Sequence, residues 1–127
     1  RNESSAASDV YKRQELLGAY HKLNHAENEL EKNNLNAKSL WTKYDAEFHQ
    51  MLIKKCNSLN LIRIHEVIFD KYLRYQLLIL KYRGKDSIKE HKDLLDYSLI
   101  SNIQKAQNTL RDHIKKGVDY ASSNLLL

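Results

Sequence analysis

The sequence predicts an all-α protein, folded as an antiparallel bundle of about five helices. Proline is absent from the 127 residues and glycine occurs only three times, so few positions interrupt a helix. Apolar residues recur three and four positions apart through most of the chain, which is the spacing that places them on one helix face. The length suits a single domain with one core.

The first three expected helices occupy residues 15–32, about 37–56 and about 61–82. Leu16, Tyr20, Leu23 and Leu30 give the first helix its apolar face, and the polar pair Asn33-Asn34 ends it. The second helix has a broad apolar flank. The third has apolar residues on more than one side, which indicates a central or interface helix.

Two capping motifs predict where the fourth and fifth helices begin. Ser87 and Glu90 form an S-x-x-E capping box, and Ser101 and Gln104 form the corresponding S-x-x-Q box. We therefore expect helices that start at these two serines. Gly117 is expected to end or loosen the last turn of the fifth helix.

A candidate metal site is spread over the second, fourth and fifth of these helices. Asp45 and His49 are four residues apart, so both side chains lie on one helix face, about 5 to 6 Å from each other. His91 and His113 each lie within an apolar helical pattern, and we expect both to point into the bundle. One carboxylate and three imidazoles suit zinc or a neighbouring divalent metal. The pattern alone fits hydrogen-bonded histidines near a core equally well.

Several short motifs surround these candidate ligands. They are residues 45–52 (DAEFHQML), Leu61, residues 87–91 (SIKEH), Ala106 and residues 110–114 (LRDHI). Together they resemble the FCD domain, the all-helical effector-binding and dimerisation domain of FadR-subfamily GntR transcription regulators. The resemblance extends from about Glu15 to Tyr120. It implies the ligand set of the metal-binding branch of that family, namely Asp45, His49, His91 and His113.

The resemblance implies a sensor, not an enzyme. The expected cofactor is a divalent metal ion, zinc first, with nickel and manganese as alternatives. Four protein ligands leave room on such an ion for a small carboxylate effector. Arg74 is the candidate second anchor for that carboxylate, and Tyr44 and Tyr75 are candidate pocket residues. Arg74 fits a salt bridge to Asp70, or to a partner subunit, equally well.

The resemblance also implies a cytoplasmic homodimer. In the family a winged helix-turn-helix domain precedes the FCD domain and binds DNA, so we expect DNA binding only through that domain, which this sequence does not contain. The formal net charge of +5 is spread along the chain without a basic run, so no nucleic-acid site is expected here. The sequence contains no apolar run of about 18 residues, so no membrane partner is expected.

The first fourteen residues require a separate interpretation. Residues 4–14 read SSAASDVYKRQ, which resembles a translated sequencing adapter. We therefore expect residues 1–14 to be non-native, disordered or irregular, and packed against nothing. The FCD-like domain is expected over residues 15–122, with a tail at 123–127. The chain would then be a metagenomic fragment that lacks the family's first effector-domain helix.

Two other function classes stay open at this point. A metal-dependent helical-bundle enzyme would need a general base beside a metal-bound water, or paired Glu-x-x-His motifs for two irons. Neither pattern occurs, because Glu47 and Glu90 adjoin candidate ligands in sequence and so face elsewhere on their helices. The third class is a helical interaction domain that binds no metal.

Overall fold

The structure is a computed structural model that describes residues 2–56, 63 and 82–125. Within these residues it contains α-helices, one short 3-10 helix and no strand, which confirms the all-α prediction. The elements are α1 (Asn2–Glu31), η1 (Leu35–Ala37), α2 (Lys38–Cys56), α4 (Lys85–Leu99) and α5 (Ile103–Leu125). The described residues thus form four of the about five α-helices expected. The helix predicted over residues 61–82 lies outside them, except for Arg63 and Tyr82.

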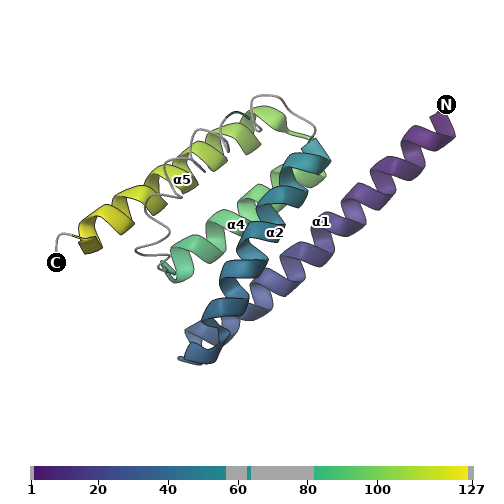
Figure 1. Cartoon of the computed structure of the whole chain (residues 1–127). Coiled ribbons are helices and arrows are strands. Elements are labelled where there is room, and N and C mark those ends of the chain that lie inside the picture. Colours follow the sequence, from purple (N-terminus) through teal and green to yellow (C-terminus); the bar gives the residue numbers. More distant parts are fainter. Residues whose placement is uncertain (1, 57–62, 64–81, 126–127) are drawn as a thin grey trace.

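The four helices form two antiparallel hairpins (Figure 1). The first joins α1 to α2, and the second joins α4 to α5. Asn33 ends α1 with a positive φ of 64°, a conformation that asparagine tolerates well, and its N–H bonds the carbonyl of Leu30 at 3.0 Å. The predicted helix end at Asn33-Asn34 is therefore confirmed. Because α4 packs on both α1 and α2, the hairpins meet along α4.

The core lies where these helices face one another. Its largest fully buried apolar side chains come from every described α-helix and are Leu16, Leu23, Phe48, Leu52, Leu94 and Leu110. Burying one leucine or phenylalanine side chain contributes about 1.5–3 kcal/mol. None of the described helices is both long and apolar enough to cross a membrane.

The helix α4 begins two residues earlier than the sequence predicted. It starts at Lys85, and Gly84 precedes it with a φ of 74°, a conformation that favours glycine, with no side-chain cap. Ser87 is a buried residue inside the first turn and does not cap the helix. The capping box was the wrong interpretation because Glu90 bonds side chains elsewhere.

The start of α5 also differs from the prediction. Ser101 has a positive φ of 56° and lies in the turn, whereas the Oδ1 atom of Asn102 accepts the N–H of Lys105 at 3.2 Å. Asn102 is therefore the cap in place of Ser101. Gly117 does not end the helix, because its φ is not positive and α5 continues through it to Leu125. Residues 123–125, the first part of the expected tail at 123–127, belong to this helix.

Residues 2–14 are helical instead of irregular. They form the first part of α1, because they contain no glycine or proline that would stop a helix growing toward the N-terminus. Their described side chains at positions 7–14 are mostly exposed. Among the described side chains of this segment two contacts reach the bundle, so the expectation that it packs against nothing was wrong. The Nη1 atom of Arg13 donates to the Leu99 carbonyl at 3.4 Å, and Nζ of Lys54 lies 5.9 Å from the Tyr11 ring. The adapter origin of the segment stays a prediction.

Deleting residues 1–10 is expected to change the free energy of unfolding by no more than about 0.5 kcal/mol, the range typical of exposed positions. Leu16→Ala is the contrasting variant, because this side chain is fully buried on the same helix. It should cost about 2–5 kcal/mol. Urea denaturation of both variants measures the two changes. A loss of several kcal/mol on deletion would show that the segment is part of the folded core.

Candidate metal centre

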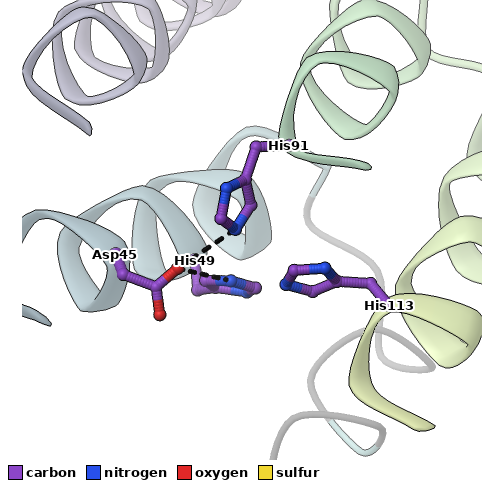
Figure 2. A group of neighbouring side chains, drawn as sticks. All are labelled: Asp45, His49, His91 and His113. Carbon is purple, nitrogen blue, oxygen red and sulfur yellow. Dashed lines mark ion pairs between the residues drawn. The ribbon is translucent and has the colours of Figure 1, made fainter. Parts of the chain in front are cut away.

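Four side chains from three helices converge near the middle of the bundle (Figure 2). Asp45 and His49 come from α2, His91 from α4 and His113 from α5. Each offers one ligand atom, and these atoms all lie within 4.8 Å of one another. The structure thus brings together all four residues that the sequence singled out.

Helical spacing and ring packing hold these four side chains close together. Asp45 and His49 lie one helical turn apart, and the Nε2 atom of His49 is 3.5 Å from Oδ1 of Asp45. The buried Phe48 ring packs edge-on against His91. The His113 ring stacks on His49 with ring centroids 5.2 Å apart and lies 4.6 Å from His91. The three imidazoles therefore form one contiguous cluster.

His91 is the buried centre of the site. Its side chain has no solvent exposure, and its Nδ1 atom lies 2.9 Å from Oε2 of Glu27 on α1. Its Nε2 atom lies 3.1 Å from Oδ1 of Asp45, but without the geometry of a hydrogen bond. A buried ring nitrogen with no hydrogen-bond partner therefore points at the carboxylate of a neighbouring candidate ligand.

His113 also has a carboxylate behind it. Its Nδ1 atom lies 2.7 Å from Oε1 of Glu90. The guanidinium of Arg83 donates to both oxygens of Glu90, and its Nη2 atom lies 3.4 Å from Nδ1 of His113. Nζ of Lys116 lies 3.9 Å from Glu90 as well. The Glu90 charge is thus balanced by cations from the protein.

The charges of the cluster are strongly coupled. Burial lowers the pKa of His91, but the carboxylates of Asp45 and Glu27 outweigh burial and raise it to about 9. Burial would raise the pKa of Asp45, but His49 and His91 hold it well below its usual value. Burial lowers the pKa of His113 to about 3, against the opposing effect of Glu90. At neutral pH, His91 is therefore protonated and His113 neutral when no ion competes for them.

Glu90 is held in its charged form. Burial raises the pKa of this carboxyl group, but its hydrogen bonds to His113 and Arg83 outweigh burial and lower the pKa to about 2. It is therefore a fixed anion that accepts a hydrogen bond from His113 Nδ1–H. Both oxygens of Glu90 are therefore engaged in hydrogen bonds, with His113 and with Arg83.

The donor set fits a divalent metal ion. Carboxylates on the Nδ1 atoms of His91 and His113 leave the Nε2 atoms unprotonated in the neutral rings, which is the usual arrangement behind metal-bound histidines. Zinc bonds of about 2.0–2.2 Å place two ligand atoms at most about 4.4 Å apart. Since the four atoms already lie within 4.8 Å, small side-chain adjustments suffice to bind one ion.

Sequence reasoning missed the supporting residues. Glu27 lies four residues after Leu23 in the buried stripe of α1, and a carboxylate in an apolar stripe was the available signal. Glu90 was interpreted as a capping residue and was expected to face away from the candidate ligands. That expectation was wrong, because its carboxylate contacts His113. Nothing in the sequence indicated that Arg83 would turn back onto α4.

Of the three predicted effector contacts, the structure describes one. Arg74 and Tyr75 lie outside the described residues. Tyr44 is half-buried against the core, with Nζ of Lys22 5.9 Å from its ring centroid and Nζ of Lys43 6.0 Å from it. All three stay predictions.

Comparison with known families agrees with this architecture. The family model described as "FCD domain" matches residues 3–116. The chain belongs to the FCD domain family. FCD domains are ligand-binding, regulatory domains of GntR-type regulators and not enzymes. The match begins within the segment that we attributed to an adapter. No curated protein and no solved structure matches the chain.

Metal binding near pH 7.5 is expected to release about one proton, from His91, because its raised pKa keeps the ring protonated until an ion competes for Nε2. Apparent affinity should then rise about tenfold per pH unit and level off above about pH 9. Calorimetric titration in buffers of different ionisation enthalpy measures the number of protons. Binding without proton release would show either that His91 is neutral before the ion binds or that it is not a ligand, and the metal content of His91→Ala distinguishes these two outcomes.

Proposed function

We propose that this FCD domain is the ligand-sensing domain of a FadR-subfamily GntR regulator and holds one divalent metal ion, zinc in the first instance. The proposed ligands are Asp45, His49, His91 and His113. The observation that carries the proposal is their convergence from three helices, with one donor atom each within 4.8 Å. Two of the imidazoles are also oriented by carboxylates.

The proposed signal is a small carboxylate that binds at the ion. A divalent ion that accepts up to six ligands supplies Lewis acidity and open positions for carboxylate oxygens. The protein's own groups set the charge around it. Asp45 and Glu27 together contribute two negative charges, while Arg83 offsets Glu90.

The buried carboxylates also affect how an effector would be held at the ion. With Asp45 as the only carboxylate, a divalent ion would leave net positive charge in the cavity. The buried Glu27 carboxylate removes that excess, so an effector would be held by coordination and by a guanidinium. Arg74 remains the proposed guanidinium. The domain is further proposed to act as a cytoplasmic homodimer that controls DNA binding by a winged helix-turn-helix domain.

An enzyme is the weaker alternative. The carboxylate most able to act as a general base beside the cluster, Glu90, is already bound to His113 and Arg83. A metal-free interaction domain is the other alternative. In it a protonated His91 would pair its Nε2–H with the Asp45 carboxylate 3.1 Å away, so metal occupancy distinguishes the two functions.

After mild dialysis the protein is expected to retain about one divalent ion per chain, and His91→Ala should abolish retention because it removes the central ligand. His25→Ala is the matched control, since the His25 side chain is 77% exposed. Elemental analysis measures occupancy. Full occupancy in His91→Ala would exclude this ligand set.

A chelator should lower the melting temperature of the metal-loaded protein. An ion present at a hundred times its dissociation constant stabilises the folded state by about 2.7 kcal/mol. Scanning calorimetry with and without the chelator tests this, and His91→Ala should show no response. A melting temperature indifferent to chelator in both proteins would favour the metal-free alternative.

A hydroxy or dicarboxylic acid is expected to bind the metal-loaded protein and to bind the metal-stripped protein at least tenfold more weakly, because coordination supplies part of its affinity. Arg74→Ala should weaken binding, whereas Arg63→Ala, at a described and exposed position, should not. Titration calorimetry with a panel of such acids measures both effects. Equal binding without metal, or no effect of Arg74→Ala, would contradict the proposed geometry.

A further inference from the structure

Glu27 is a buried carboxylate outside the proposed ligand set. It lies on α1, 64 positions before His91, and has no solvent exposure. Among the described residues its one ion pair is with His91, and its Oε1 atom has no hydrogen-bond partner. Glu90, in contrast, has two cations beside it. A buried carboxylate is costly unless it is paired, so the contact with His91 dominates the energetics of Glu27.

The contact determines how the His91 ring can act. When the neutral ring donates its Nδ1–H to Glu27, the lone pair is on Nε2. Nε2 faces Asp45, and the His91 ring adjoins both His49 and His113. If the ring were the other tautomer, Nε2 would carry a proton and could not coordinate an ion.

We propose that Glu27 is the positioning residue of the metal centre and fixes the tautomer and orientation of His91. Tight metal binding then requires that α1 is packed in place against the other helices. The inference rests on the proposed metal centre and deepens it. The four ligands come from α2, α4 and α5, so α1 would contribute to the ion only through this contact. A carboxylate behind a metal-bound histidine also raises the basicity of the ring.

Two substitutions separate the parts of this role. Glu27→Gln keeps the shape and an acceptor for Nδ1–H but removes the charge. Glu27→Leu removes the acceptor as well. Glu29→Gln is the matched control, because Glu29 lies on the same helix and, among the described residues, its carboxylate pairs with His25 and Asn34 near the surface.

Cobalt(II) titration, followed by its visible absorption, measures affinity in the folded proteins. Glu27→Gln should bind about 10–100-fold more weakly than the unmodified protein, and Glu27→Leu more weakly still. Glu29→Gln should bind as the unmodified protein does. If Glu27 only packs α1 against the bundle, both Glu27 variants will lose stability yet bind cobalt with unchanged affinity once folded. That result overturns the inference.

Nitrogen-15 spectra of the histidine rings in the zinc-loaded protein give a readout independent of affinity. His91 should show a protonated Nδ1 and a metal-bound Nε2 in the unmodified protein and in Glu27→Gln. Glu27→Leu should lose this single form, and if that variant does not fold, Glu27→Gln alone decides the affinity test. Failure of the unmodified protein to bind cobalt would overturn the metal centre itself. Equal tight binding by all variants would overturn only the role of Glu27.

Discussion

The buried imidazole of His91, held between two carboxylates, is the interaction on which the rest of this structure depends. Glu27 approaches one ring nitrogen from α1 and Asp45 the other from α2, while the ring itself belongs to α4. Two carboxylates in an apolar interior repel each other and lose hydration, so each requires a positive partner. A proton on His91 provides part of that charge, and a divalent ion would provide more. The stability of the bundle therefore depends on which positive charge, a proton or a divalent ion, occupies this polar centre.

The buried charge of the second pair, Glu90 and His113, is balanced in a different way. His113 is neutral, and Glu90 behind it is balanced by Arg83 and Lys116. This half of the site is complete without an added cation, whereas the half around His91 is not. The asymmetry explains why metal binding should respond most to changes at Glu27 and His91. It also leaves Glu90 no capacity for base catalysis, which agrees with the regulatory character of FCD domains.

The sequence was sufficient for what depends on local spacing. The pairing of Asp45 with His49 follows from one helical turn, and the inward phase of His91 and His113 follows from their apolar neighbours. The helix end at Asn33-Asn34 was likewise local. Glu27 could not be found this way, because its partner lies 64 residues away and only packing brings the two together. The capping boxes failed for a related reason, since a tertiary contact of Glu90 outweighed its local motif.

The central claim is that three imidazoles and one carboxylate bind a single ion. X-ray absorption at the metal edge of the zinc-loaded protein tests it most directly, because it reports the ligand atoms themselves. The account predicts a shell of nitrogen and oxygen at about 2.0–2.2 Å, with the outer scattering of about three imidazole rings. A thiolate sulfur at about 2.3 Å, for which Cys56 is the only source, or a shell of oxygens without imidazole, would contradict it.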